Sequence, residues 1–322
     1  MTRASIPGVA VVTINWNGWR NTLACLAALR ATRGVAWRLI IVDNASTDES
    51  ASHLVDLGDD VTTIWSPVNG GWTGGNNLGV AHALAAGYEH VLILNNDAFV
   101  EPDTLAEFLA AQAHAPGGVL GGAMKSEDGH SDGPAGSVLN PKTGTVQWLR
   151  LADIELSENG LRPAAAVMGA AMFAHRDVFE AVGPFDDNFY LYYDEIDWCA
   201  RANKLGHACF FAERATLRHV GAASTGGMDS PLVGYFMTRN SLLFVERHST
   251  GRQRLTMARI VLGRIRQDAK AIGAGWWPLT LLTASEPRLL ARRRGVIDYL
   301  TRRFGDCPAS VRQLQKAWRR PA

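Results

Sequence analysis

Short apolar runs that end abruptly in asparagine or aspartate recur along the first third of the chain. The clearest spans residues 91–100, VLILNNDAFV, where four apolar residues are followed by Asn95, Asn96 and Asp97. Runs of this length, bounded by polar residues, are typical of strands buried in a parallel sheet. The pattern therefore predicts a strand whose polar triplet lies at its carboxyl end, where open α/β sheets bind ligands.

The residues before this stretch repeat an order of strand, polar turn and helix. Three further apolar runs predict strands, at residues 9–14, 39–42 and 61–65. Ser46 or Asp48 is expected to cap the helix after the second of them. A glycine-rich segment at 69–77 precedes a helix expected from about residue 78 to residue 86. This alternation favours an α/β fold with a doubly wound, mostly parallel sheet and flanking helices.

The second half of the chain is less regular. Residues 101–115 predict a helix, whereas residues 116–163 are rich in Gly, Ser and Asp and predict loops and edge strands. Helices are expected at 175–180 and again from about Asp194. Residues 228–322 show helical spacing and are predicted to form a C-terminal helical extension.

Composition is that of an ordinary globular protein, because 47% of the residues are hydrophobic and 20% are charged. The net charge of +1 is unevenly distributed, since residues 286–322 carry +7 and the remainder carries −6. This asymmetry indicates an acidic body with a basic tail. The four cysteines are far apart and form no CxxC pair, which argues against a zinc site or a disulfide framework and fits a reducing cytoplasm.

A basic amphipathic helix is predicted after residue 251. One face is apolar and comprises Ala258, Val261, Leu262, Ile265 and Ala269; a neighbouring stripe is basic and comprises Arg252, Arg259, Arg266 and Lys270. Contact with an anionic membrane and packing on the domain explain this pattern equally well. No apolar stretch approaches the roughly 18 residues of a membrane span, and no credible signal peptide is present. We expect a cytoplasmic protein, with peripheral contact at the inner face of the cell membrane as an alternative to a freely soluble one.

Asp97 and His219 are candidate ligands for a cation. Asp97 offers a hard oxygen at the end of a predicted strand, which suits a divalent metal and a diphosphate; a simple Asn/Asp turn is the alternative. His219 opens a loop of small residues whose backbone N–H groups are suited to a phosphate. A lone histidine is more often a surface or core residue than a ligand.

A second candidate site is the acidic stretch at 188–201, NFYLYYDEIDWCAR. Asp197 is explained by the preference of acids for a helix N-terminus and by Arg201 one turn later. That explanation does not extend to Asp194 and Glu195, which follow five largely apolar residues. A carboxylate held beside apolar walls is suited to act as a general base.

Taken together, these segments resemble an inverting family 2 glycosyltransferase of the GT-A fold, closest to its rhamnosyltransferase-like branch. The resemblance covers residues 9–227. It rests on six ordered motifs: TINWNG (13–18), IVDNASTDES (41–50), NGGWTGGNNLG (69–79), LILNNDAFVEP (92–102), FYLYYDEIDWCARA (189–202) and HVGAAST (219–225). The glycine-rich motif lacks the spacings of dinucleotide-binding and P-loop motifs. The resemblance implies a catalytic domain over residues 1–227.

The resemblance also implies roles for individual residues. Ile14 and Trp16 would hold the nucleobase, Asp43 would accept its N–H, and Asn96 would meet the ribose. The full set expected to bind the nucleotide sugar is Ile14, Asn15, Trp16, Asp43, Asn76, Asn95 and Asn96. Asp97 and His219 would bind Mg²⁺ or Mn²⁺, and Glu195, or its neighbour Asp194, would be the catalytic base. Two positions depart from the family pattern: Asn95 replaces the first Asp of the DxD motif, and the usual Glu-Asp pair is reversed at 194–195.

The activity implied is metal-dependent transfer of a sugar to a hydroxyl of a glycan or lipid-linked acceptor, with inversion, in the synthesis of cell-surface polysaccharide. The donor would be dTDP-L-rhamnose or a UDP-hexose, and no nucleic-acid partner is expected. A sugar nucleotidyltransferase is less consistent with the sequence, because the turn at 15–18 offers no glycine-rich basic loop. A non-catalytic module that binds nucleotide sugars would need no carboxylates at 194–195. The oligomeric state stays open.

Overall fold

The structure is a computed structural model of the 322-residue chain. It describes residues 6–125, 134–150, 155, 157–220, 227–271 and 286–318. The chain divides into two compact units. The sheet unit comprises Met1–Leu139, Val146–Asp186 and Asp194–Gly221; the helical unit comprises Asn140–Thr145, Asp187–Tyr193 and Ala222–Ala322.

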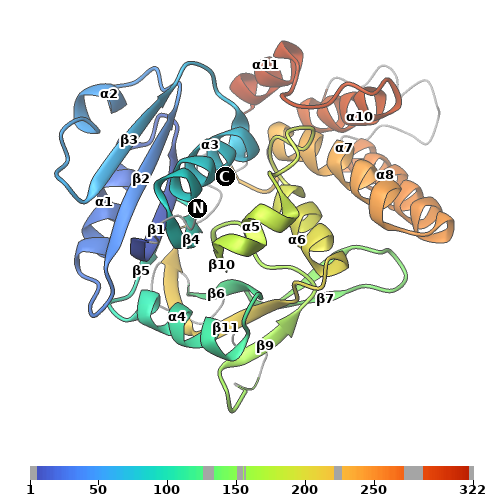
Figure 1. Ribbon diagram of the computed structural model, residues 1–322. Coiled ribbons are helices and arrows are strands. Elements are labelled where there is room, and N and C mark those ends of the chain that lie inside the picture. Colours follow the sequence, from blue (N-terminus) through green and yellow to red (C-terminus); the bar gives the residue numbers. More distant parts are fainter. Residues whose placement is uncertain are drawn as a thin grey trace. The chain divides into compact units, whose positions relative to one another are not determined.

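The sheet unit is built, in its described residues, on a nine-stranded sheet of order β3-β2-β1-β4-β10-β6-β11-β5, with β9 paired to β11 (Figure 1). The strands are β1 (Ile6–Asn15), β2 (Trp37–Asn44), β3 (Val61–Ser66), β4 (Tyr88–Leu94), β5 (Ala98–Val100), β6 (Val119–Lys125), β9 (Leu161–Ala164), β10 (Ala171–His175) and β11 (Cys209–His219). Strands β1–β4, β6 and β11 run in one direction, and β5, β9 and β10 run in the other. The doubly wound, mostly parallel sheet predicted from the sequence is therefore confirmed.

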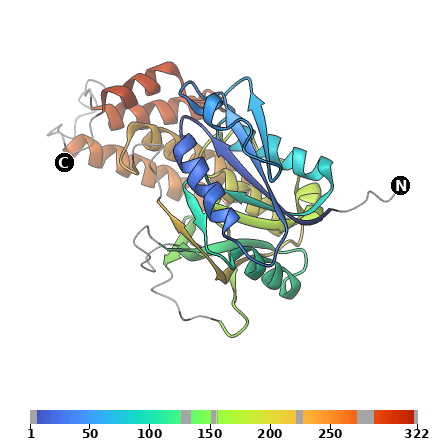
Figure 2. The same cartoon turned by 90° about the vertical axis from the view of Figure 1, so that its left-hand side faces the viewer.

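Helices cover both faces of this sheet, as Figures 1 and 2 show. They are α1 (Trp19–Arg30), α2 (Ser50–His53), α3 (Gly71–Ala86), α4 (Thr104–His114), α5 (Arg176–Val182) and α6 (Asp194–Lys204). Side chains of α1 and α4, such as Leu29 and Phe108, share one buried core with alternate strand residues such as Val11 and Leu92. Each fully buried side chain of this size contributes roughly 1.5–3 kcal/mol. This core fixes the strand ends at which the polar residues lie.

The glycine-rich segment forms the first half of α3, which begins at Gly71 and not near residue 78 as expected. A Cβ atom added at Gly79 would lie 2.3 Å from Val12 Cγ1, and one at Gly75 would lie 2.8 Å from Ile14 Cδ1. Such separations are shorter than any non-bonded contact, so glycine lets α3 lie directly against β1. The glycines serve helix–sheet packing, which overrides their low helix propensity.

Residues 116–163 also differ from expectation. β6 is an interior strand between β10 and β11, because its glycines leave room for large neighbours. A Cβ at Gly122 would lie 2.4 Å from Leu217 Cδ2. Strands β7 (Pro134–Leu139) and β8 (Val146–Arg150) form a separate two-stranded sheet. Of the two expected caps, Asp48 Oδ1 accepts from the Ser50 N–H at the start of α2 (3.0 Å), whereas Ser46 contacts the β1 turn.

The helical unit contains α7 (Pro231–His248), α8 (Gly251–Ala271), α10 (Pro287–Leu300) and α11 (Ala309–Ala317). This confirms the predicted helical C-terminal region. Val261, Ile265 and Ala269 of the predicted apolar face of α8 are buried, as expected. Ala258 and Leu262 are exposed, and Met257 is buried in their place. None of the helices in the described ranges is long and apolar enough to cross a membrane.

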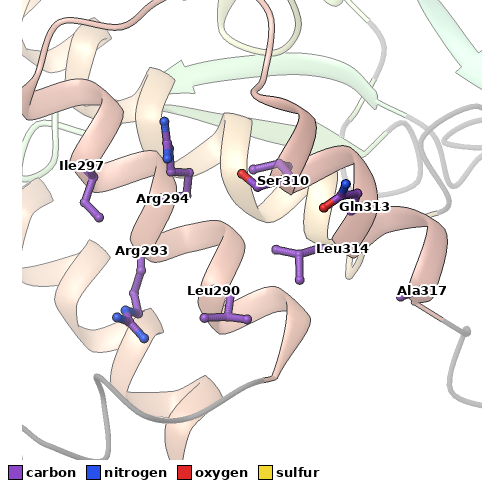
Figure 3. A pocket seen from close by; sticks show the side chains of 9 residues that line it. Leu290, Arg293, Arg294, Ile297, Ser310, Gln313, Leu314 and Ala317 are labelled. Carbon is purple, nitrogen blue, oxygen red and sulfur yellow. The ribbon is translucent and has the colours of Figure 1, made fainter.

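An open groove of about 520 Å³ lies between α10 and α11. Leu290, Ile297 and Leu314 give it an apolar lining, and Arg293 and Arg294 also line it (Figure 3). Ile297 is 50% exposed there. The groove thus combines exposed apolar surface with two guanidinium groups.

Candidate active site

The carboxyl ends of β1 and β2 are joined by a closed set of hydrogen bonds, which we call the bracing cluster: Asn15, Thr22, Asp43, Ser46 and Ser50. The amide of Asn15 donates to Asp43 Oδ2 (2.8 Å), to Ser50 Oγ (2.9 Å) and to Ser46 Oγ (3.1 Å). Its oxygen accepts from Thr22 Oγ1 at 2.8 Å. Asn15 is fully buried. Its polar atoms are used inside the protein, because register places it between two strand ends, and its expected contact with the nucleotide stays a prediction.

Asp43 and Trp16 remain candidates for contact with a nucleobase. Asp43 is 4% exposed, and its other carboxylate oxygen accepts from the Ser46 N–H at 2.9 Å. Trp16, in the turn after β1, is 40% exposed and so offers ring surface to a ligand. Ile14 is half-buried against Gly75. The bracing cluster thus holds the Asp43 carboxylate in one orientation near these two residues at the end of β1.

Asn44, which the sequence did not single out, links β2 to α3. Its amide donates to Asn69 Oδ1 (3.1 Å) and Gly71 O (2.9 Å), and its oxygen accepts from the Gly70 N–H (3.0 Å). The only signal in the sequence was its position directly after a predicted strand, where other polar residues of the candidate site also lie. Asn76 is 1% exposed and donates to Trp72 O within its own helix. Its side-chain oxygen is buried and has no hydrogen-bond partner among the described residues, and its expected contact with the nucleotide sugar stays a prediction.

The three residues after β4 point their polar atoms at different partners. Asn95 Oδ1 accepts from Trp72 Nε1 (3.2 Å), and the Asn96 amide donates to Thr22 Oγ1 (3.1 Å). The first residue therefore faces α3 and the second faces α1. Asp97 is 8% exposed and faces β11. This divergence leaves Asp97 as the residue of the triplet that meets His219.

Strand pairing brings Asp97 and His219 together from distant parts of the sequence. β5 runs antiparallel to β11 with Ala98 opposite His219, and the Val220 N–H donates to Asp97 O at 3.1 Å. His219 Nε2 consequently lies 3.3 Å from Asp97 Oδ1. In the part of the chain that the structure describes, this buried ring nitrogen has no hydrogen-bond partner.

The pair fits two neighbouring positions around a divalent cation. Two ligands that are each about 2.1 Å from an ion lie roughly 3 Å apart at adjacent corners of an octahedron. No group of three or more His, Cys, Asp or Glu side chains suited to a metal is found within the described ranges. Mg²⁺ at phosphates commonly takes oxygens of a substrate and of water beside one or two protein ligands.

The carboxylates Asp194 and Glu195 lie at the first turn of α6, as predicted. Asp194 is 3% exposed, whereas Glu195 is only partly buried. Burial and the neighbouring Glu195 charge raise the pKa of Asp194 well above its usual range. Burial also raises the pKa of Glu195. The more accessible Glu195 is thus the carboxylate that can meet a substrate, and Asp194 retains its proton to higher pH.

Asp197 is structural, as the sequence predicted. Its carboxylate pairs with Arg201 Nε at 2.9 Å, and the Arg201 guanidinium also donates to Val182 O and Pro184 O. The pair fixes α6 to the end of α5. The rest of the loop that His219 opens lies largely outside the described residues.

Comparison with known proteins assigns the family. The sequence model described as "Glycosyl transferase family 2" matches residues 10–183, more than half of the chain. The hexosyltransferase Agl10 of low-salt glycan biosynthesis in Haloferax volcanii is 29% identical over 176 residues, which are 53% of this chain and 54% of the relative. The chain thus spans about half the length of that relative.

Two further proteins are similar over more of their length. The N-acetylglucosaminyl-diphospho-decaprenol L-rhamnosyltransferase of Mycobacterium tuberculosis is 24% identical over 259 residues, covering 74% of this chain and 84% of the relative. The mannosyltransferase PcManGT from Pyrobaculum calidifontis, solved with GDP-Man and Mn²⁺, superposes with a TM-score of 0.55 at 16% identity. That match covers 92% of this chain and 88% of the solved one, and it shows the shared GT-A fold.

Proposed function

The chain belongs to glycosyl transferase family 2, and from that premise we propose that it is a metal-dependent, inverting glycosyltransferase. It moves a sugar from a nucleoside diphosphate sugar to a hydroxyl group of a glycan or lipid-linked acceptor. The observation that carries this proposal is the meeting of Asp97 with His219 Nε2, a buried atom that the described chain leaves without a hydrogen bond. A buried nitrogen without a hydrogen bond is costly, and a cation bound by this nitrogen and the Asp97 carboxylate would remove that cost.

Asp97 and His219 would hold Mg²⁺ or Mn²⁺. When bound, such an ion neutralises the charge that develops on a departing diphosphate. The protein's own groups orient the donor: Trp16 and Ile14 flank the nucleobase, and the braced Asp43 accepts its N–H. Asn96 is the candidate for the ribose.

Glu195 provides the chemistry on the acceptor side. The acceptor oxygen forms a bond to the anomeric carbon, the bond from that carbon to the diphosphate oxygen breaks, and Glu195 takes the hydroxyl proton. Attack opposite the leaving group inverts the anomeric configuration. A raised pKa makes Glu195 a stronger base, closer to the operating pH. Asp194, which retains its proton more readily, leaves the negative charge of the pair on Glu195.

The donor that we propose first is dTDP-L-rhamnose, with a UDP-hexose second. The names of two relatives, an L-rhamnosyltransferase and a hexosyltransferase, support these two classes. Recognition through Asp43 and a ring at Trp16 suits thymine and uracil alike. The acceptor that we propose is a lipid-linked glycan in cell-surface polysaccharide synthesis, because the rhamnosyltransferase relative is named for a diphospho-decaprenol-linked sugar.

A thermal-shift screen of nucleotide sugars tests the proposal, since a ligand that binds the native state raises Tm. We expect dTDP-L-rhamnose or a UDP-hexose to raise Tm with Mn²⁺ or Mg²⁺ and much less with EDTA. Release of nucleoside diphosphate in the presence of acceptor separates a transferase from a binding module. Release of inorganic diphosphate from a nucleoside triphosphate and a sugar phosphate would instead identify a nucleotidyltransferase. If no donor raises Tm and none is turned over, the proposal is overturned.

We also propose peripheral contact of the helical unit with anionic lipid. Arg252, Arg259 and Lys270 are exposed along α8, and the groove between α10 and α11 offers apolar surface beside Arg293 and Arg294. Flotation with vesicles that contain phosphatidylglycerol should show binding that weakens as salt rises. Replacing Arg252, Arg259 and Lys270 together by Gln should reduce it. If the protein does not float with the vesicles at low salt, packing is the only role left for α8.

A further inference from the structure

The backbone immediately before Asp194 is held in a conformation that its side chains disfavour. Tyr190, Tyr192 and Tyr193 have φ angles of 66°, 65° and 68°. Bulky residues rarely adopt this left-handed region, because the Cβ atom crowds the backbone. Such conformations persist only where surrounding contacts enforce them, and they cluster at functional sites. Some part of the helical unit must therefore hold this segment.

Asn240 of α7 holds three carbonyl groups of the segment with one amide nitrogen. Asn240 Nδ2 lies 2.9 Å from Phe189 O, 2.8 Å from Leu191 O and 2.8 Å from Tyr192 O. Asn240 is fully buried. Three converging carbonyls on one donor group define the curvature of the backbone from 189 to 192.

Arg239 adds a second anchor, and all five of its N–H donors are used. Nη2 donates to Asn188 O (3.1 Å) and Phe189 O (3.0 Å). Nη1 donates to Gly305 O (2.7 Å) and Tyr235 Oη (3.2 Å), and Nε donates to Asn240 Oδ1 (2.9 Å). The last bond orients the Asn240 amide toward the segment.

This guanidinium is buried without a direct counter-ion among the described residues. Arg239 is fully buried, and its burial lowers its pKa. The nearest carboxylate, Asp298, reaches it only through the Tyr235 hydroxyl, which donates to Asp298 Oδ2 at 2.8 Å. Burying a charge against backbone carbonyls is expensive in stability. The arrangement is better explained by the geometry that it imposes on residues 188–193 than by stability.

We propose that Arg239 and Asn240 form a clamp that positions the Asp194–Glu195 carboxylates by fixing the left-handed backbone before α6. Successive helical residues are about 100° apart around the axis. A shift of the first residue of α6 would therefore rotate the Glu195 side chain around the helix axis, away from its present direction. The clamp residues are not among those assigned to the donor, the metal or the base, so they are positioning residues, and their role rests on the proposed function of Glu195.

Two substitutions break the clamp in different ways. Asn240→Asp keeps the shape but replaces the amide donor by an oxygen that faces three carbonyls. Arg239→Lys keeps the charge but offers three donors in place of five. Glu246→Gln is the matched control: Glu246 lies on the same helix, and its ion pair with Arg302 (2.8 Å) does not involve residues 188–193.

The first readout is turnover, followed as nucleoside diphosphate released from dTDP-L-rhamnose or, where the wild type does not use it, from UDP-glucose. Misplacement of a catalytic group by about 1 Å costs on the order of 10²-fold. We expect kcat to fall by that order in both clamp variants while the donor KM stays within about 2-fold of wild type. Glu246→Gln should retain wild-type values. If the two residues had a purely structural role, their substitution would lower Tm without lowering kcat at an unchanged donor KM.

The second readout is hydrogen–deuterium exchange, which needs no substrate. Both clamp variants should show faster exchange in peptides covering 188–196, with strands β1 to β4 unchanged. If Asn240→Asp does not fold, Arg239→Lys decides alone. Wild-type exchange in this segment, or wild-type kcat in a folded clamp variant, would overturn the clamp. A wild-type protein that turns over no nucleotide sugar would refute the proposed function instead, and faster exchange would then still establish the clamp's hold on the segment.

Discussion

Two groups of polar residues at the strand ends of the sheet unit differ in how completely they are hydrogen-bonded. In the bracing cluster, both polar atoms of Asn15 have partners, and so have both carboxylate oxygens of Asp43. In the pair formed by Asp97 and His219, the buried ring nitrogen Nε2 of the half-buried histidine has no hydrogen bond within the described chain. The same holds for Asp194 Oδ2 at the start of α6.

The difference separates residues that build the site from residues that act in it. A closed polar network rigidifies the backbone that carries it. A buried polar atom without a hydrogen bond costs about 1–3 kcal/mol, and a ligand or a proton that completes it removes this cost. Substitutions in the closed cluster should therefore lower stability, whereas substitutions of the open groups should weaken ligand binding and turnover.

Glu195→Gln should give the largest effect on turnover. Loss of a general base typically costs 10²–10⁴-fold, whereas the amide preserves shape, so the donor-induced rise in Tm should remain. Glu180→Gln is the control, because Glu180 is half-exposed on α5 and pairs only with Arg176 among its described contacts. Rates of nucleoside diphosphate release decide the matter. If Glu195→Gln keeps its turnover and Asp194→Asn loses it, the base is Asp194.

Asp97→Ala and His219→Ala should each remove the part of donor affinity that depends on the divalent ion. We expect Kd to rise by at least about 10²-fold, given that even residues behind metal ligands contribute 10–100-fold. Calorimetry with Mn²⁺ and with EDTA measures this difference. Asp103→Ala, an exposed acid whose side chain makes no capping bond at α4, should bind as wild type. Full wild-type turnover in EDTA would contradict a metal role.

The sequence predicted the strands better than the contacts between distant segments. Strand ends and the start of α6 followed from local hydrophobic pattern, which is why Asp97 and Glu195 were placed correctly on their elements. The register of β5 against β11, which brings His219 to Asp97, is a long-range pairing that no local pattern encodes. The pairing of these two residues could be expected only through the family resemblance.

The burial of Asn15 and Asn76 could not be predicted for a related reason. Asn15 at a strand end and Asn76 within a helix can each face a ligand or the protein interior, and only the packing of α1 and α3 decides between them. The helical start of α3 was missed because glycine disfavours helices unless close packing rewards it. Arg239 and Asn240 carry no motif signal, since their partners are backbone carbonyls, which exist at every position.

Asn15→Ala should test the closed cluster through stability. It would leave Asp43 Oδ2 and the Thr22 hydroxyl without their 2.8 Å partners and open a small cavity. At about 1–3 kcal/mol for each unsatisfied group, we expect a loss of roughly 3 kcal/mol in the free energy of unfolding. Urea denaturation measures this loss. Ser52→Ala, an exposed hydroxyl on the nearby α2, should stay within about 0.5 kcal/mol of wild type. An unchanged stability together with weaker donor binding would return Asn15 to the ligand-binding set.

Asp194→Asn should have the smallest effect on turnover and a pH-dependent effect on stability. Burial and the Glu195 charge raise the folded-state pKa of Asp194 above its unfolded value of about 4. Between these two values the folded state binds more protons than the unfolded state, so wild-type stability falls as pH rises through that window. Asparagine carries no ionisable group and removes this dependence. The variant should therefore gain stability relative to wild type from about pH 4 upward, and the two should differ little below it.

Urea denaturation at a series of pH values from about 4 to 8 follows the difference, and Glu180→Gln, changed at an exposed position, should track wild type throughout. A constant offset at every pH would mean that the Asp194 proton does not couple to folding. Asp194→Asn is expected to show this pH trend and to keep substantial turnover. That combination would mean that Asp194 supports Glu195 through the proton that it retains.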